Sequence, residues 1–154
     1  MPRHVQASHR IFVDAPVGRC FMFFTPAGEE LWVAGWQPCY LHPADGRTEA
    51  GMVFTTGHGG ETTIWLLADF DRRAHRSRYV RCNPGSRTGT VEIRCRALND
   101  ERTEVEVAYT LTALGDEGEL ALEAFEGEAF TAMIEGWARG IDARRDELLA
   151  ANIR

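Results

Sequence analysis

Arg81 is the residue of this sequence whose type and position are best suited to recognising a ligand. It lies two residues after Tyr79 in a run typical of a β-strand, His75 to Cys82. Because side chains alternate between the faces of a strand, Arg81 points into the protein if Tyr79 does. Its guanidinium would then bind a carboxylate or enolate of a ligand at the mouth of a cavity. Alternatively, the apolar neighbour Val80 points into the protein, and Arg81 then lies in solvent.

Glu126 is the second charged residue that stands among apolar ones. Helical spacing places it on the same side as Phe130 and Met133. A carboxyl group buried there would have a raised pKa and could act as an acid or a base. Alternatively, Gly127 breaks the helix and Glu126 lies near the positive N-terminus of a helix that begins after it.

Aromatic side chains are the third candidate group, because several fall on faces expected to point between a sheet and a helix. Any one of them taken singly is explained by core packing. Together they could line a pocket for a flat or ringed ligand, since tyrosine and tryptophan combine an apolar body with a polar tip. The candidate lining residues are Trp36, Phe54, Trp65, Tyr79, Tyr109, Phe130 and Trp137, with Arg81 beside them.

Metal binding and nucleophilic catalysis are poorly supported by the remaining residues. His42, His58 and His75 are dispersed, and Glu61 follows His58 by three residues without forming an H-E-x-x-H motif. The segment from Gly85 to Gly89 is not a G-x-S-x-G elbow, and a turn explains it. We therefore expect no metal site, and the sequence identifies no catalytic residue.

The basic residues are all arginines, since the sequence has 17 of them and no lysine. This excludes a Walker A loop and pyridoxal phosphate chemistry, both of which need a lysine amine. We expect no cofactor. The net charge of −6 argues against nucleic acid as a partner, although residues 72–102 contain nine arginines and only three acidic residues. A strand region with one face in solvent explains that local excess.

The N-terminus and the cysteines bear on the compartment. Residues 1–10 contain no apolar core of a signal peptide, and the longest apolar run, Ile64 to Ala68, is too short to cross a membrane. The four cysteines show no C-x-x-C spacing, and Cys95 has the pattern of a small core residue. These features predict reduced thiols in a cytoplasmic protein without membrane insertion. A homodimer is compatible with the sequence.

The first elements that position these residues are a strand over Val5 to Val13 and two short helices after it. Asp14 is expected to cap the first helix, with Pro16 in its first turn. Thr25 and Pro26 end that helix and cap a second one, whose positive end Glu29 and Glu30 would favour. The stretch 31–51 is rich in Gly, Pro and aromatic residues and predicts a loop with one short strand.

Alternating segments separated by turn residues follow, and they predict an antiparallel sheet with one buried face. The expected strands are Met52 to Thr56, Thr62 to Phe70, His75 to Cys82, Thr90 to Leu98 and Thr103 to Leu114. After them, Glu119 to Ala151 contains no proline and repeats apolar residues at helical spacing, which predicts one long helix.

These elements predict an α+β fold in which a curved six- or seven-stranded antiparallel sheet wraps around a long C-terminal helix. At 154 residues the chain fits one domain spanning residues 1–154. A curved sheet and a straight helix do not fit everywhere, so a cavity between them is expected, and such cavities bind apolar ligands.

The sequence resembles the START/Bet v 1-like helix-grip superfamily, also called SRPBCC, which includes polyketide cyclase-like proteins. The resemblance covers nearly the whole chain. It rests on His9 to Pro16 before a Phe-rich helix, Trp32 to Trp36, Gly51 to Phe54, Thr63 to Trp65, Arg102 to Val105 and the helix with Gly136 and Trp137. The superfamily hosts lipid carriers, hormone receptors, cyclases and chaperone activators, so the resemblance implies a fold more specifically than a function.

Three functions follow as hypotheses. The first is binding of a small hydrophobic or aromatic ligand in the cavity. The second is an enzyme of the cyclase or aromatase kind, in which Arg81, Tyr79 or His58 polarises a carbonyl or moves a proton. The third, implied by the resemblance to chaperone activators, is a protein adaptor whose Arg-rich outer sheet face, including Arg94 and Arg96, docks an acidic partner.

Overall fold

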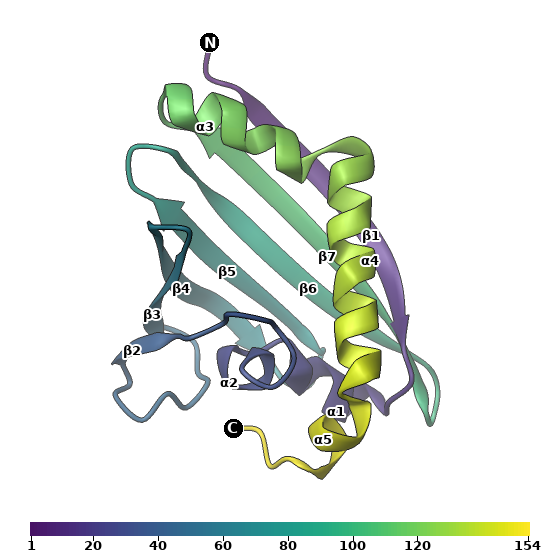
Figure 1. Ribbon diagram of the computed structural model, residues 1–154. Helices are drawn as coiled ribbons and strands as arrows, with labels where there is room; N and C mark the ends of the chain where they lie inside the picture. The colour runs from purple at the N-terminus through teal and green to yellow at the C-terminus, as the bar shows by residue number, and fades with distance from the viewer.

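The computed structural model describes all residues from Met1 to Arg154. Its elements cover the chain from β1 at the N-terminus to α5 near the C-terminus (Figure 1). In order they are β1 (His4–Val13), α1 (Val17–Phe23), α2 (Pro26–Glu29), β2 (Cys39–His42), β3 (Val53–His58), β4 (Glu61–Asp71), β5 (Arg76–Asn83), β6 (Arg87–Asn99), β7 (Arg102–Ala113), α3 (Asp116–Ala121), the 3-10 helix η1 (Leu122–Phe125), α4 (Gly127–Ala143) and α5 (Arg145–Ala150).

The strands form one seven-stranded antiparallel sheet in the order β1-β7-β6-β5-β4-β3-β2. The sheet is twisted, and α4 runs along one of its faces, where it contacts β1 (Figure 1). The short helices α1 and α2 close one end of that face, while α3 and η1 lie at the other. The predicted helix-grip architecture is therefore confirmed.

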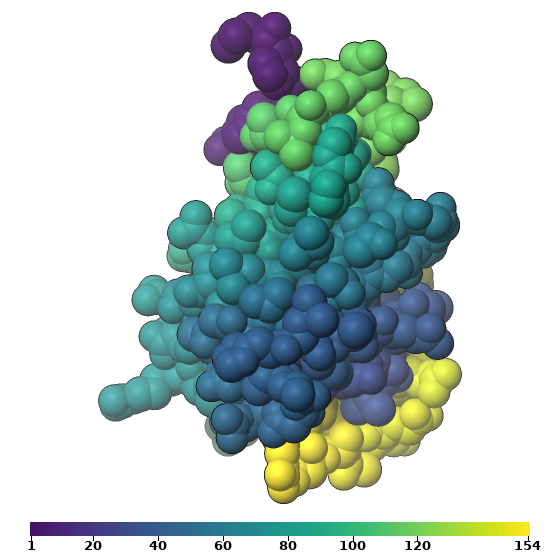
Figure 2. Space-filling view, turned by 90° about the vertical axis from the view of Figure 1, so that its left-hand side faces the viewer, coloured from purple at the N-terminus to yellow at the C-terminus, as the bar shows by residue number.

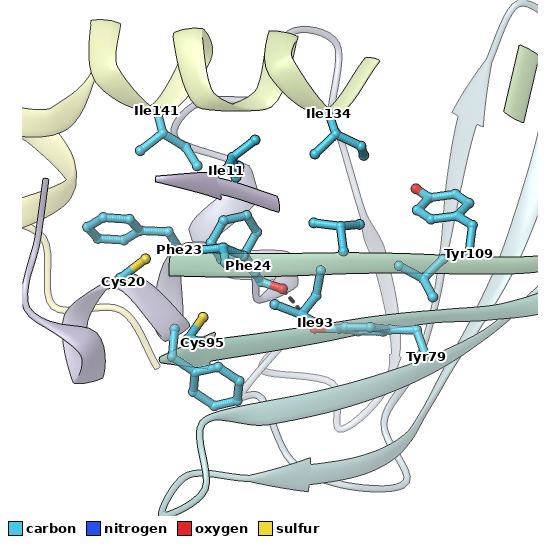
Figure 3. Close-up of a cluster of buried hydrophobic side chains, with 14 of the residues drawn as sticks. Ile11, Cys20, Phe23, Phe24, Tyr79, Ile93, Cys95, Tyr109, Ile134 and Ile141 are labelled. Atoms are coloured by element: carbon cyan, nitrogen blue, oxygen red, sulfur yellow. Dashed lines mark hydrogen bonds between the residues drawn. The ribbon is translucent and has the colours of Figure 1, made fainter. Parts of the chain in front are cut away.

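Alternation along the strands explains which face is buried. In β7 every second residue is buried, among them Val105, Val107 and Leu111. The apolar side of α4 meets this face through Phe130, Ile134 and Ile141. Figure 3 shows Ile134 and Ile141 pointing from α4 toward the strands that carry Ile93 and Tyr109. Cys95 is buried in the same core, as its pattern predicts.

The prediction of one long helix over Glu119 to Ala151 is wrong, because the segment is divided into α3, η1, α4 and α5. The main break falls at Glu126, which is extended (φ −139°, ψ 158°), and Gly127, whose φ is +58°. A left-handed φ is readily adopted only by glycine, so the chain turns here and α4 starts in a new direction. The alternative in which Gly127 breaks the helix is the one that the structure adopts.

The predicted N-terminal cap is present in α2 but not in α1. Thr25 caps α2 as predicted, since its Oγ1 accepts a hydrogen bond from the Gly28 N–H at 3.0 Å. Asp14 does not cap α1, because Pro16 occupies the N-cap position and no side chain bonds there. The Asp14 carboxylate instead lies 3.5 Å from Arg145 and 3.9 Å from Arg102.

The outer face of the sheet carries part of the basic segment, including Arg78 and Arg96. Arg78 of β5 lies opposite Glu92 of β6, with 3.7 Å between Nε and Oε1. Arg96 of β6 lies opposite Glu104 of β7 and donates to it at 2.8 Å. Cross-strand carboxylates thus balance part of the positive charge on this face.

The C-terminal tail packs beside the segment between β2 and β3. Thr48 Oγ1 donates a hydrogen bond to the backbone oxygen of Arg154 at 3.2 Å. Figure 2 shows this contact region from the side, with the β2–β3 segment in blue above the yellow tail. None of the helices is long and apolar enough to cross a membrane.

Candidate functional site

A cavity of about 280 Å³ lies between the buried face of the sheet and the helices that cover it. Strands β3 to β7 supply one wall, while α2, η1 and α4 supply the other. Exposed His58 and Glu61, on either side of the β3–β4 turn, are part of the lining, so the cavity reaches the surface there. The complete lining is Phe24, Glu29, Val33, Trp36, Phe54, His58, Glu61, Thr63, Trp65, Tyr79, Arg81, Arg87, Val91, Ile93, Tyr109, Phe125, Met133 and Trp137.

Most candidate lining residues from the sequence do meet at this cavity. Those in its wall are Trp36, Phe54, Trp65, Tyr79, Arg81, Tyr109 and Trp137. Phe130 is the exception, since it does not line the cavity. It is only 1% exposed and packs edge-on against Tyr109, with 5.4 Å between ring centres. Phe130 therefore belongs to the core between α4 and the sheet.

The aromatic wall is held in place by ring packing and by satisfied indole groups. Phe54 and Trp65 stack with 5.8 Å between ring centres and 5° between planes. Trp36 meets Trp65 edge-on at 5.9 Å. The Nε1–H of Trp65 donates to Thr56 Oγ1 at 2.9 Å, and that of Trp36 donates to the Pro26 oxygen at 2.9 Å. Because these polar tips are engaged, the rings offer mainly apolar surface to the cavity.

The two tyrosines of the wall are deeply buried and remain protonated over a wide pH range. Tyr79 donates its hydroxyl to the backbone oxygen of Phe24 at 3.1 Å, the bond drawn dashed in Figure 3. Burial raises the pKa of Tyr79 well above its usual value. Burial also raises the pKa of Tyr109 to about 12, against the opposing effect of the nearby Arg81 charge.

Arg81 faces the cavity and not the solvent. Its side chain therefore lies on the same face of β5 as that of Tyr79. The residue is 7% exposed. Its Nη2 donates to Asn83 Oδ1 at 2.9 Å, while its Nε has no hydrogen-bond partner. The guanidinium lies close to two rings, with Cζ 5.1 Å from the centre of Trp65 and 5.5 Å from that of Phe125. Burial lowers the pKa of Arg81, the nearby Tyr109 opposes this effect, and the Arg87 charge lowers the pKa further.

A second buried arginine, Arg87, was not among the residues expected at the site. Its Nη1 and Nη2 donate to the two carboxylate oxygens of Glu61 at 3.1 and 3.0 Å, and Nη1 also donates to Ser86 Oγ. The hydrogen bond to Arg87 is the main reason why the pKa of Glu61 is lowered. Period-two counting back from Val91 would have placed Arg87 on the inner face.

Glu29 is the other residue that the sequence did not place at the site. It belongs to α2 and lines the cavity with a half-buried side chain. Burial raises the pKa of its carboxyl well above 4.5. The sequence pattern suggested a role at the helix terminus, and nothing in it shows that α2 turns this residue toward the cavity.

The remaining candidates lie elsewhere. Glu126 forms an ion pair with Arg3 and its side chain is 41% exposed, so it is neither buried among apolar residues nor part of the cavity. His42 lies in the exposed strand β2, and His75 packs against the ring of Phe21 at 5.9 Å. No three His, Cys, Asp or Glu side chains are grouped as they would be around a metal ion.

Comparison with solved structures identifies the fold. The structure matches Ara h 8.0201 with a TM-score of 0.65 and 12% identity, covering 97% of this chain and 100% of that chain. It matches norcoclaurine synthase from Thalictrum flavum with a TM-score of 0.66 and 11% identity, covering 97% and 89%. A protein from Rhizobium leguminosarum gives a TM-score of 0.65 at 14% identity, covering 98% of each chain.

These matches place the chain in the class of Bet v 1-like helix-grip folds, as the resemblance in the sequence implies. At such low identity the likeness concerns the fold alone. No protein-family model and no curated protein matches the sequence. One of the matched norcoclaurine synthase structures is a complex with dopamine and hydroxybenzaldehyde, at a TM-score of 0.65 and 8% identity.

Proposed function

We propose that this protein binds a small hydrophobic or aromatic molecule in the cavity between its sheet and its C-terminal helices. The observation that carries the proposal is the aromatic wall around a space of about 280 Å³. Small-molecule sites typically measure about 300–1,000 Å³ and combine apolar walls with a few polar groups. This cavity is slightly smaller than that range, which favours a compact ligand of one or a few rings.

The structural neighbours are consistent with such a role. The norcoclaurine synthase complex holds dopamine and hydroxybenzaldehyde, two small aromatic molecules.

The four free cysteines, of which Cys39 is exposed, fit a reducing compartment such as the cytoplasm.

The proposal is tested by titrating the protein with N-phenyl-1-naphthylamine, a neutral apolar dye that fluoresces when it leaves water. We expect saturable binding by the unaltered protein. Val33→Trp should weaken that binding by about tenfold, because Val33 lines the cavity and a larger side chain would occupy the space of the dye.

Val53→Trp is the matched control. Val53 is also half-buried, but it does not line the cavity and it precedes the inward-facing Phe54 on β3. This variant should bind the dye as the unaltered protein does. Equal weakening by both substitutions, or no saturable binding at all, would contradict the proposal.

A second candidate is an enzyme of the cyclase or aromatase kind, and Glu29 is the observation that favours it. A carboxyl with a raised pKa in an apolar cavity can exchange a proton with a bound ligand. Arg81 and His58, which line the same cavity, could polarise a carbonyl group. Tyr79 is less suited to donate a proton, because its hydroxyl is already bonded to the Phe24 backbone.

This candidate is tested by following deuterium uptake at the methylene carbon of a β-diketone. We expect the protein to accelerate exchange, and Glu29→Gln to remove the acceleration. Glu30→Gln is the control, because the neighbouring Glu30 is exposed and bonds Tyr40 outside the cavity. Exchange no faster than in buffer would exclude this chemistry.

A further inference from the structure

We propose that the ligand of the cavity is an acid, and that its anionic group binds the guanidinium of Arg81. This inference rests on the proposed binding function and specifies the chemistry of the ligand. It follows from three features of the structure: the burial of Arg81, the charge balance around it, and the unbonded Nε of its guanidinium.

The burial of Arg81 is unusual for a charged group without an ionic partner. At 7% exposure the side chain has given up most of its contact with water. The guanidinium donates a hydrogen bond to the neutral oxygen Asn83 Oδ1 and interacts with the hydroxyl of Tyr109, which is also neutral. Asn83 is itself fixed in this orientation, since its Nδ2 donates to Thr63 Oγ1 at 2.7 Å. A buried cation normally pairs with an anion, because otherwise the loss of hydration is not offset.

The charges near Arg81 leave one positive charge unbalanced. Glu61 is the nearby carboxylate, but both of its oxygens accept hydrogen bonds from Arg87. These three side chains therefore carry a net charge of +1. The other carboxyl in the wall, Glu29, does not supply the missing anion, because burial favours its protonated form. An anionic ligand would complete the balance.

The geometry leaves room for this anion at the edge of the guanidinium. The rings of Trp65 and Phe125 lie beside it, with their centres 5.1 and 5.5 Å from Cζ. Nη2 donates a hydrogen bond to Asn83 Oδ1, while Nε is buried and has no hydrogen-bond partner. The N–H groups of a guanidinium lie in its own plane, which is the plane in which a carboxylate binds arginine. The apolar walls beyond it would contact the rings of the ligand.

The test compares 2-naphthoate with its neutral counterpart 2-naphthamide by calorimetric titration. The two compounds share the ring system and nearly the same shape, so their difference in affinity reports the anion. We expect naphthoate to bind about tenfold more tightly, as for one charge-assisted hydrogen-bonded contact. In Arg81→Gln that preference should fall to about twofold or less, while naphthamide should still bind, which shows that the cavity is intact.

Arg78→Gln is the matched control for net charge. Arg78 lies on the same strand three residues earlier, but on the outer face, where it pairs with Glu92. This variant should keep the full preference for naphthoate. Equal loss of preference in both variants would show that the effect is one of overall charge and would overturn the inference.

The other outcomes separate this inference from the proposed function. If naphthamide binds and naphthoate binds no better, the inference that the ligand is an acid is wrong, whereas the proposed binding function of the cavity is supported. If neither compound binds, both fail. A preference that persists in Arg81→Gln would also overturn the assignment to Arg81.

Thermal stability gives a second readout. Without ligand, Arg81→Gln should melt no lower than the unaltered protein, because it removes a buried charge that lacks an ionic partner. Naphthoate should raise the melting temperature of the unaltered protein more than that of the variant. A large loss of stability in ligand-free Arg81→Gln would instead identify Arg81 as a structural residue.

Discussion

Trp65 and Arg81 lie directly opposite each other on β4 and β5, and the guanidinium of Arg81 is 5.1 Å from the centre of the Trp65 ring. Both side chains point to the buried face of the sheet, where they form part of the cavity wall. The strand register thus sets the position of the cation. A ring face attracts a cation more strongly where water is excluded, so Trp65 is expected to stabilise the buried charge in part.

Replacing Trp65 therefore should lower stability in a graded way. Trp65→Leu removes the stack on Phe54, the contact with Arg81 and the hydrogen bond to Thr56, and should cost about 3 kcal/mol. Trp65→Phe keeps an aromatic face and should cost about 1 kcal/mol, chiefly for the lost hydrogen bond. Urea unfolding of both variants measures the difference, and equal losses would show that the ring face contributes little.

The same substitution at two glycines of α4 should have opposite effects. Gly127→Ala should destabilise by about 1 kcal/mol, because φ at this position is +58° although nothing lies within 4 Å of an added Cβ. Gly136→Ala should stabilise by about 0.5–1 kcal/mol, because Gly136 is inside the helix and its added Cβ meets only Arg139 at 3.6 Å. Denaturant midpoints decide the matter, and the same sign for both would refute the role assigned to the helix break.

Glu29→Gln should stabilise the protein at neutral and higher pH. In the unfolded chain this carboxyl titrates near pH 4.5, whereas burial raises the pKa in the folded protein. As pH rises above 4.5 the unfolded chain releases the proton first, so the folded state loses relative stability. Each unit of difference between the two pKa values corresponds to about 1.4 kcal/mol.

The measurement is the free energy of unfolding of both proteins at about pH 4 and about pH 8. The advantage of Glu29→Gln should be present at the higher pH and vanish at the lower one. Glu101→Gln, in the exposed β6–β7 turn, serves as the control and should show no such dependence. An advantage that is independent of pH would argue against a buried, protonated Glu29.

The three tyrosines should resist ionisation in the folded protein. Burial is the main reason why the pKa values of Tyr40, Tyr79 and Tyr109 are all raised from 10.0, that of Tyr109 to about 12. Ultraviolet absorbance at about pH 11 should show almost no tyrosinate in the native protein and extensive ionisation in denaturant. Since the unfolded chain ionises first, stability should fall as pH rises above 10. A native titration centred near pH 10 would contradict the burial of these hydroxyls.

The strands and most of the cavity wall could be predicted because period-two alternation fixes which side chains share a face. That rule placed Tyr109 correctly on β7 and allowed Arg81 to face inward with Tyr79. It could not choose between the two parities of β5, because Val80 and Cys82 on the outer face are also apolar and half-buried. Only packing against the rest of the protein resolves this choice.

The features that the sequence did not predict depend on the direction of the backbone in the folded protein. Helical periodicity continues across Glu126 and Gly127, so it could not reveal that the chain turns there. The same periodicity identified Phe130 as apolar but did not show that it packs against Tyr109 in the core and does not line the cavity. Glu29 reaches the cavity through the orientation of α2, a tertiary feature that the local sequence does not encode.

The pairing of β1 with β7 has a consequence for how the chain acquires its structure. His4 lies opposite Thr112, and Val13 lies opposite Thr103, so the first strand finds its partner only near the end of the sheet-forming segment. Bringing such distant residues together carries a large loop-closure entropy and slows folding. During synthesis, the N-terminal strand therefore cannot pair until β7 has been made, so the sheet is completed only after all of its other strands are present.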